Sequence, residues 1–112
     1  MINSNPKTFE EFWPCYLGEH RNPRNRALHF AGTTLVYAIV ALAFLDSFRY
    51  LILAPLVGYG FAWVGHFFVE KNRPATFSYP LWSLRGDFRM HARMATGRLG
   101  LDLERLEQKT PA

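Results

Sequence analysis

Two long apolar runs without Lys, Arg, Asp or Glu occupy the middle of this chain of 112 residues. The first extends from Ala27 to Leu45 and the second from Tyr50 to Val69. About 20 apolar residues suffice for a helix to cross the hydrocarbon core of a bilayer, and both runs are of that order. Four residues separate them, which is short enough for the turn of a helical hairpin. The sequence therefore predicts a small all-α membrane protein, in which a central two-span hairpin is flanked by amphipathic helices.

Basic residues are distributed unevenly around this hairpin. The turn contains Arg49, whereas most Lys and Arg residues lie outside the two spans. Those on the flanks are Lys7, Arg21, Arg24 and Arg26 before the hairpin and Lys71, Arg73, Arg85, Arg89, Arg93 and Arg98 after it. The positive-inside rule then predicts that both termini are cytoplasmic. The formal net charge of +4 suits anionic headgroups or an acidic small molecule. We expect no nucleic-acid binding, because the basic residues flank apolar spans and are not interleaved with exposed aromatics.

A soluble helical bundle with a fully buried central pair is the alternative to the membrane hairpin. We rank it second, because a chain of 112 residues has little polar helix with which to cover two such helices, unless it oligomerises. Length and composition indicate one domain over residues 1–112. The single cysteine, Cys15, offers no internal disulfide and no cysteine-rich metal site. Any metal in this chain must therefore be bound by histidine and carboxylate ligands.

The N-terminal flank is predicted to be a helix. Thr8 and Glu11 have capping-box spacing, in which Thr8 accepts from the amide of Glu11 and the Glu11 carboxylate accepts from the amide of Thr8. Pro14 is expected to kink this helix or to move its start toward Phe12. We expect aromatic residues of this flank, such as Tyr16, in an interfacial belt.

The C-terminal flank is predicted to be a basic amphipathic helix over about residues 81–106. A break is expected near Gly97 or Gly100, because glycine ends or weakens helices. From about Gln108 onward the tail is expected to be disordered.

Histidines in the apolar spans are the strongest functional signal. One continuous helix would put His20 and His29 on opposite faces, but Pro23 breaks it and allows His20 to fold back over His29. In an antiparallel hairpin His29 and His66 lie at similar depth, and Glu70 shares a helix face with His66 through its i, i+4 spacing. Three histidines and a carboxylate can therefore converge in a set that suits Fe(II), Zn or Mn.

Other interpretations of these residues stay open at this point. A lone histidine on an apolar helix is more often a hydrogen-bonded interior residue than a ligand, and only the three together favour a metal. Glu70 also fits a solvated helix end or an ion pair with Arg26. His91 lies in a basic stretch and is expected at the surface.

Two strings of the sequence resemble the Mpo1-like family of small membrane proteins. They are YLGEHRNPRNRALHFAGT, from Tyr16 to Thr33, and WVGHFFVEKNRPATFSYPLWSLRGDFRM, from Trp63 to Met90, and the resemblance extends from about Phe9 to Leu99. The residues that match the family pattern are His20, Asn25, His29, Gly32, Gly65, His66, Glu70, Pro74 and Ala75.

The resemblance implies an activity and a metal. The yeast member of the family is regarded as an iron(II)-dependent dioxygenase that uses O2 to shorten 2-hydroxy fatty acids by one carbon in α-oxidation. By matching positions, the catalytic and iron-binding role falls to His20, His29 and His66. The chain departs from the longer family members after Pro80, so the fourth ligand stays open. The candidates for that fourth ligand are Glu70, Asp87 and His91.

Substrate contacts follow as expectations from the same interpretation. Asn25, Arg26 and Arg73 are expected at the substrate, with Arg85 as a further partner for a carboxylate. The acyl chain is expected along the hairpin between aromatic side chains. These are Tyr59, Phe61, Phe67 and Phe68.

Two functions of other classes compete with an enzyme. The protein could be a non-enzymatic membrane scaffold in which the histidines hydrogen-bond between helices. It could instead bind a metal or haem for structure or electron transfer. The chain is small for an enzyme that must shelter reactive oxygen species, which favours a homodimer.

Overall fold

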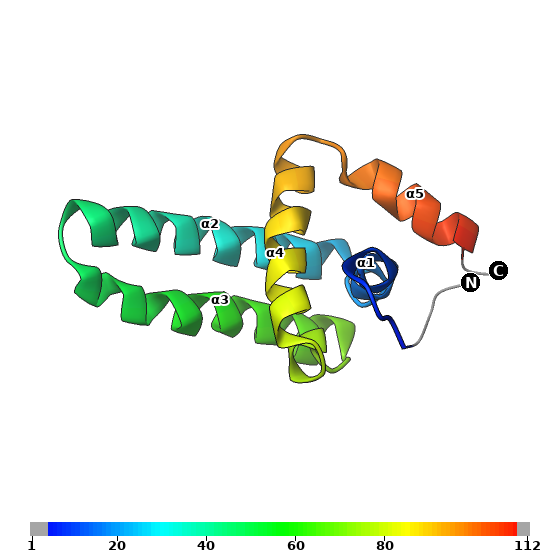
Figure 1. Ribbon diagram of the computed structural model, residues 1–112, viewed down its shortest axis with the longest axis horizontal. Helices are drawn as coiled ribbons and strands as arrows, with labels where there is room; N and C mark the ends of the chain where they lie inside the picture. Colours follow the sequence, from blue (N-terminus) through cyan, green and yellow to red (C-terminus); the bar gives the residue numbers. More distant parts are fainter. Residues whose placement is uncertain (1–4, 110–112) are drawn as a thin grey trace.

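The computed structural model describes residues 5–109, and all regular structure in that range is helical (Figure 1). The elements in chain order are α1 (Phe9–Gly18), α2 (Pro23–Leu45), the 3₁₀ helix η1 (Phe48–Ile52), α3 (Leu53–Val64), the π-helix η2 (Gly65–Glu70), the 3₁₀ helix η3 (Ala75–Phe77), α4 (Pro80–Ala95) and α5 (Leu99–Lys109). The prediction of an all-α fold is confirmed.

The two apolar runs form an antiparallel hairpin, with α2 lying beside α3 along its length (Figure 1). Pro23–Leu45 and Phe48–Glu70 are each 23 residues long and apolar enough to cross a membrane. Each exceeds the predicted span by a few residues. The first does so because the Asn22 side chain caps the amide of Arg24 and starts α2 before Ala27. Only 17% of the most apolar window of each helix is buried. The structure therefore lacks the buried central pair that the soluble bundle requires.

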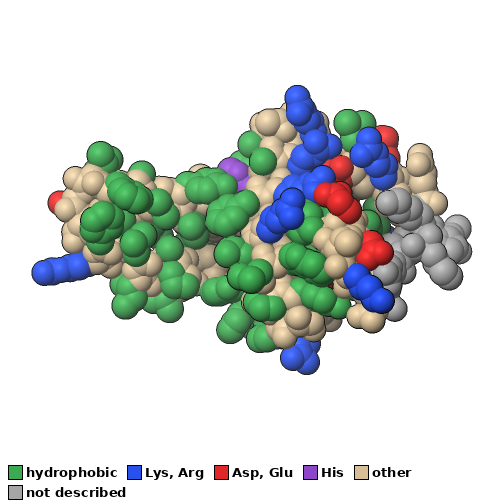
Figure 2. Space-filling view, in the orientation of Figure 1, with side chains coloured by type: hydrophobic (Ala, Val, Ile, Leu, Met, Phe, Trp, Pro, Cys, Tyr) green, Lys and Arg blue, Asp and Glu red, His purple; other side chains and the backbone are tan. Residues whose placement is uncertain are grey.

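Figure 2 shows that apolar side chains dominate the hairpin, while most basic side chains on this face gather at the opposite end, over α4 and α5. Large exposed apolar residues of the hairpin include Leu42, Phe44, Leu45, Phe48, Ile52, Leu56 and Phe68. A continuous apolar surface of this kind is rare on soluble monomers and is typical of a membrane or protein contact. The charge distribution matches the asymmetry expected from the sequence.

Two glycines allow the hairpin helices to pack closely. A Cβ on Gly32 of α2 would lie 2.8 Å from the Cβ of Phe61, and one on Gly58 of α3 would lie 3.3 Å from a methyl group of Val36. The first distance is shorter than side chains tolerate, so α2 and α3 approach each other here because Gly32 has no side chain. This close approach brings α2, which carries His29, near the end of α3, where η2 and His66 follow.

The core of the protein lies outside the hairpin, where α1 packs against α4 and α5. Its buried members are Phe9, Phe12, Trp13, Tyr16, Leu17, Met90, Leu99 and Leu106. Tyr16 is 1% exposed, so its expected interfacial place is wrong. Gly86 of α4 is the reason: a Cβ there would lie 3.0 Å from the Tyr16 ring, so the glycine makes room for it.

The contacts at the start of α1 match the predicted capping box only in part. The Thr8 side chain accepts from the Glu11 amide as predicted, but the Glu11 carboxylate accepts from the amide of Lys7 and not from that of Thr8. Pro14 lies inside α1 and does not end it.

The predicted break in the C-terminal flank is confirmed at Gly97. Its φ of 71° ends α4 and lets α5 turn back, a conformation that glycine adopts without strain. α5 continues through Lys109, so the disorder expected from Gln108 does not begin there. The remaining residues of the expected tail lie outside the described part of the chain.

Candidate metal centre

Three histidines from three segments meet at one point where the hairpin joins the rest of the fold. His20 follows α1, His29 lies near the start of α2, and His66 lies in η2. Their ring centroids are 4.5, 4.5 and 5.0 Å apart, with ring planes 77° to 84° from parallel. One nitrogen from each lies within 4.8 Å of the others, and all three residues are buried. The predicted convergence of these histidines is confirmed, and the group could hold a metal ion.

Two of the rings are fixed through their Nδ1 atoms. The Nδ1 of His20 lies 2.6 Å from the carbonyl oxygen of Tyr16, and the Nδ1 of His66 lies 2.7 Å from Oδ1 of Asn72. The Tyr16 carbonyl can only accept, so the His20 Nδ1 carries the proton. The Asn72 side-chain nitrogen donates to the carbonyl of Glu19, so its Oδ1 is the atom that faces His66. The His66 Nδ1 therefore also carries a proton and donates it to Asn72. Both Nε2 atoms are then left with a free lone pair, as in histidines that bind metals.

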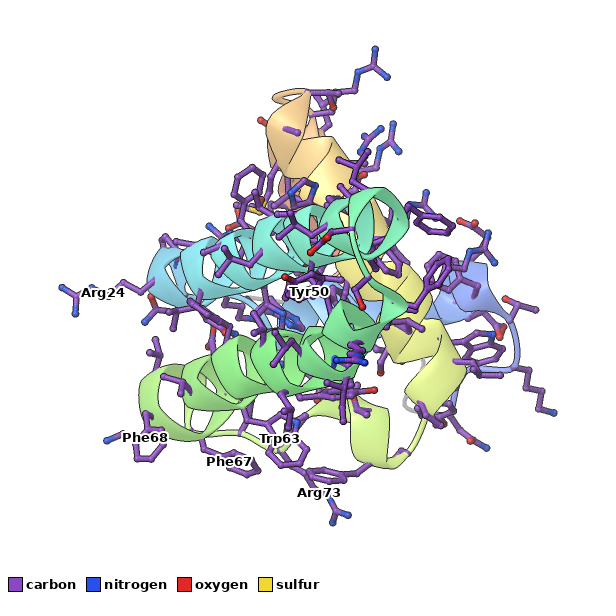
Figure 3. All side chains as sticks on the ribbon, turned by 90° about the vertical axis from the view of Figure 1, so that its left-hand side faces the viewer. Arg24, Tyr50, Trp63, Phe67, Phe68 and Arg73 are labelled. Atoms are coloured by element: carbon purple, nitrogen blue, oxygen red, sulfur yellow. The ribbon has the colours of Figure 1, made fainter. Side chains whose placement is uncertain are left out.

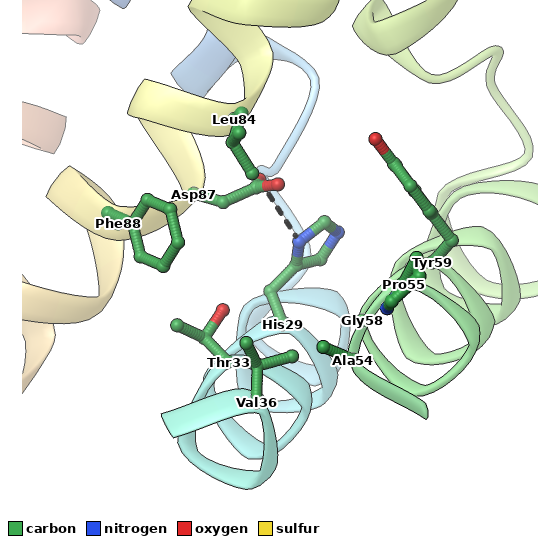
Figure 4. Close-up of a pocket in the computed structure, with 10 residues that line it drawn as sticks. All are labelled: His29, Thr33, Val36, Ala54, Pro55, Gly58, Tyr59, Leu84, Asp87 and Phe88. Carbon is green, nitrogen blue, oxygen red and sulfur yellow. Dashed lines mark ion pairs between the residues drawn. The ribbon is translucent and has the colours of Figure 1, made fainter. Parts of the chain in front are cut away.

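The third ring is held by a carboxylate. Oδ1 of Asp87 lies 3.6 Å from the Nδ1 of His29 (Figure 4). The same oxygen accepts a hydrogen bond from the hydroxyl of Tyr16. Asp87 therefore lies behind His29, on the side of the Nδ1 atom. A carboxylate in this position favours a proton on Nδ1 and makes Nε2 the more basic ligand atom.

The free nitrogens fit a bound ion. Within residues 5–109, neither the Nε2 of His20 nor that of His29 has a hydrogen-bond partner, although both are buried. A buried polar atom without a partner costs about 1–3 kcal/mol, and a metal ion removes that cost. His20, His29, His66 and Asp87 also line a small cavity of about 10 Å³, which is the size of a single atom or water. The donor set and the space both suit one metal ion.

The protonation state of His20 is also suited to binding a metal. Burial, with His29 and His66 close by, lowers the pKa of His20 well below its ordinary value. Its imidazole is therefore neutral near pH 7, and a neutral imidazole is the form that binds metals.

The segment after η2 positions His66. Lys71 has a φ of 60°, in the left-handed region that costs a non-glycine residue about 1 kcal/mol. This turn lets the amide of Asn72 donate to the carbonyl of His66 at 2.9 Å, while the Asn72 side chain donates to the carbonyl of Glu19. Asn72 thereby links the His66 ring to the segment that carries His20.

Asn25 and Gly65 bring α2 against η2. Asn25 is fully buried, and a Cβ on Gly65 would lie 1.8 Å from its Oδ1, so this approach requires glycine. Oε1 of Glu70 accepts from the amide of Asn22 and lies 3.4 Å from Nδ2 of Asn25. A carboxylate is favoured at a helix N-terminus, where amide groups are free. The structure thus places Glu70 at the start of α2 and does not bring it into the histidine group.

The other two fourth-ligand candidates, His91 and Asp87, do not belong to the group of converging donors. His91 stacks on Phe30 with centroids 4.3 Å apart, and its Nε2 lies 2.8 Å from Oγ1 of Thr34. Asp87 contacts the Nδ1 side of His29, as described above. Among the described residues the group of converging donors consists of three histidines.

The expected substrate-binding arginines contact protein groups. Arg26 donates to the carbonyls of His20 and Arg21, both at 2.8 Å. The guanidinium of Arg73 lies over the Phe77 ring, 4.9 Å from its centroid. Arg85 lies in the same way over Phe9 at 4.0 Å. None of these three arginines lines either of the two cavities that contact His29, and their substrate role stays a prediction.

A second cavity, of about 260 Å³, lies beside the histidine group between α2, α3 and α4 (Figure 4). Its lining residues are His29, Thr33, Val36, Ala54, Pro55, Gly58, Tyr59, Leu84, Asp87 and Phe88. Of the aromatics expected along an acyl chain, Tyr59 alone belongs to this lining. Figure 3 shows Phe67 and Phe68 pointing outward from the hairpin, and Phe61 packs on Gly32. Those three aromatics are therefore not part of the cavity.

Sequence reasoning missed several residues that support the centre. Tyr16 lies four residues before His20, a helical spacing that could have indicated a shared face. Asn72 carried no such signal, because its position depends on the left-handed turn at Lys71. Ser83 lines the small cavity with a buried hydroxyl, and nothing in the sequence singled it out.

The fold and the site together define the class of this protein. It is a small all-helical protein in which a buried three-histidine group that could hold a metal ion lies beside a hairpin apolar enough to cross a membrane. A family model described as "2-hydroxy-palmitic acid dioxygenase Mpo1-like" matches residues 6–99. The chain therefore belongs to the Mpo1-like family, as the sequence resemblance indicates. Searches of curated proteins and of solved structures gave no match.

Proposed function

We propose that this protein is an iron(II)-dependent dioxygenase that shortens 2-hydroxy fatty acids by one carbon. The family description supports the reaction class and the substrate class. The observation that carries the proposal is the pair of buried Nε2 atoms, on His20 and His29, that lack a protein partner beside an atom-sized cavity. Three imidazole ligands with further positions open suit iron(II) and leave room for oxygen donors of a substrate.

Each residue of the centre has a distinct role in this proposal. His20, His29 and His66 bind the metal through Nε2. Asn72 accepts a hydrogen bond from the Nδ1 of His66, and the Asp87 carboxylate lies 3.6 Å from the Nδ1 of His29, so each of the two rings has a partner on its Nδ1 side. The hydroxyl of Tyr16 donates to Asp87, which keeps the carboxylate oriented toward His29.

The iron would supply the redox chemistry by which dioxygen oxidises carbon 2 of the hydroxy acid as the bond to the carboxyl carbon breaks. With one dioxygen, the reaction balances when a 2-hydroxy fatty acid yields a fatty acid one carbon shorter, carbon dioxide and water. The protein must hold the 2-hydroxyl and carboxylate near the histidines and keep bulk water away. Burial of the three histidines supports the second requirement.

Membrane placement is part of the proposal. We place the hairpin across the bilayer as two spans with both termini in the cytoplasm, supported by the apolar hairpin and the basic opposite end. The histidine group then lies near the cytoplasmic headgroups, where the polar end of a fatty acid also lies. A homodimer stays a prediction from the small size of the chain.

The alternative functions receive less support from the site. A haem requires space for a porphyrin beside its ligands, whereas the cavity enclosed by the three histidines is about 10 Å³. A scaffold in which histidines only hydrogen-bond between helices requires partners for both ring nitrogens. Two Nε2 atoms lack such partners within residues 5–109.

Oxygen uptake tests the proposed reaction. The protein is purified without oxygen, loaded with iron(II), and given 2-hydroxypalmitate or palmitate while dissolved oxygen and fatty-acid products are followed. We expect uptake with 2-hydroxypalmitate alone and a product one carbon shorter. His29→Ala should abolish both signals, and His91→Ala, a histidine outside the group, should retain them. Iron-loaded protein that consumes no oxygen with the hydroxy acid would refute the proposed reaction.

A further inference from the structure

The larger cavity touches the metal centre at one end. His29 and Asp87 line both this cavity and the small cavity between the histidines, so the two are adjacent. The floor of the larger cavity is buried, with Thr33 9% exposed and His29 5% exposed. Its rim is open, because Leu84 and Phe88 of α4 are 45% and 38% exposed. A ligand that enters at the rim can therefore reach the histidine group.

The cavity extends along the hairpin. On α2 its lining runs from His29 to Val36, and on α3 from Tyr59 back to Ala54. Seven residues of helix correspond to a length of roughly 10 Å. The end at His29 is polar, and the end at Val36 and Ala54 is apolar (Figure 4). The apolar end lies toward the hairpin turn, because Ala54 is the second residue of α3. In a hairpin that spans a bilayer, this direction leads from the headgroups toward the middle of the membrane.

We propose that this cavity binds the acyl chain of a single-chain carboxylic acid, which enters sideways from the bilayer past the rim formed by α4. The acid head then lies at the His29 end, beside the three-histidine group, and the chain lies against Val36 and Ala54. This inference rests on the proposed function, because it assigns the substrate of that site a binding mode.

The geometry selects a single-chain acid over a membrane phospholipid. A head that contacts His29 must reach a residue that is 5% exposed, which excludes a bulky phosphodiester head with two chains. The enclosed length is roughly 10 Å, so the remainder of a long chain extends among the lipids. The cavity therefore recognises the acid end and the first part of the chain, and it gives little selection by total length.

Photo-crosslinking tests this binding mode without turnover. The protein as purified is placed in phosphatidylcholine nanodiscs under argon with a 2-hydroxypalmitate that carries a diazirine in the middle of its chain. We expect label on α2 and α3 near Val36 and Ala54, and excess 2-hydroxypalmitate should compete it away. Ala54→Trp fills the apolar end and should lower the competed label about tenfold. Val36→Phe, which fills the same end from α2, should act in the same direction.

Leu56→Trp is the matched control. Leu56 lies on the same helix, outside this cavity and 68% exposed, so the change should alter the competed label by less than about twofold. Helical circular dichroism of each variant checks that the fold is retained.

Three results would overturn the inference. One is competed label that is unchanged in both filling variants. The second is label concentrated on the groove of the opposite hairpin face, which contains Leu28, Leu56 and Phe61. The third is label that excess 2-hydroxypalmitate does not displace. Competed label in a protein without oxygen uptake would support the binding mode and refute the dioxygenase. Oxygen uptake without label in the cavity would refute the binding mode alone.

Discussion

Gly65→Ala should remove metal binding without unfolding the protein. Its new Cβ would lie 1.8 Å from Oδ1 and 2.8 Å from Cγ of Asn25, whereas real Cβ contacts are essentially never closer than 3.0 Å. Asn25 is fully buried, which leaves its side chain little room to rotate away. We therefore expect residues 25 and 65 to separate by about 1.2 Å, several times the roughly 0.2 Å within which metal–ligand distances are fixed. Because His66 follows Gly65 directly, it moves away from His29 by a similar amount. Overpacking of this kind also costs about 1–3 kcal/mol of stability.

The size of the effect on metal affinity follows from this displacement. Loss of a supporting contact behind a ligand typically weakens metal binding 10–100-fold, and displacement of a ligand itself should reach at least about 100-fold. The assay is an anaerobic iron(II) titration against a competing chelator, with helical circular dichroism and elution volume to monitor the fold.

Two further variants separate the steric explanation from others. Gly60→Ala is the control, since a Cβ there would contact nothing within 4 Å in the described part of the chain, and it should bind iron as the parent does. Asn25→Ala combined with Gly65→Ala removes the colliding atoms and leaves the Asn25 Cα at 3.6 Å, an ordinary contact. The double variant should therefore bind iron within about tenfold of Asn25→Ala alone. Gly65→Ala with parental iron affinity, or no recovery in the double variant, would refute the reasoning.

Three other predictions concern the same centre. Asn72→Ala removes the acceptor of the His66 Nδ1 proton and should weaken iron binding about 10–100-fold in the same titration. Asn72→Asp keeps an acceptor, so its iron affinity should be close to that of the parent. Equal affinities for the two variants would contradict this role of Asn72. His91→Ala should leave iron content unchanged and lose about 0.5–1.5 kcal/mol of stacking with Phe30, seen as a lower melting temperature; loss of iron would contradict its place outside the centre. Chelation of iron should lower the melting temperature of the parent and should have no effect on His29→Ala. The parent should lose about 2.7 kcal/mol of stability when the free iron that is removed exceeded Kd 100-fold. An equal shift in both proteins would show that the chelator acts elsewhere.

The hairpin and the histidine group could be predicted because strong local signals determine them. Two uncharged runs of about 20 residues leave few folds open, and Pro23 ends any helix that would hold His20 and His29 on opposite faces. Once the hairpin is antiparallel, His29 and His66 must lie at similar depth. The hairpin and the histidine group thus depend on the length of the apolar runs and on the spacing of residues, and both can be read directly from the sequence.

The environment of the centre could not be predicted in the same way. Glu70 has the spacing of a ligand, but the free amides at the start of α2 bind its carboxylate, and that partner lies 48 residues away in sequence. Tyr16 is amphipathic and suits either a membrane interface or a core, and only the packing of α1 against Gly86 decides between them. Asn72 reaches His66 through one left-handed residue, a backbone state that Lys71 does not reveal.

Iron content measured on parent protein and single histidine variants tests the three-histidine centre most directly. Each protein is purified without oxygen, reconstituted with iron(II), freed of excess metal and analysed by elemental mass spectrometry. We predict about one iron per chain in the parent and in His91→Ala, and almost none in His20→Ala, His29→Ala or His66→Ala. Parental iron content in all three of these variants would contradict the account, as would a parent that holds no metal after reconstitution.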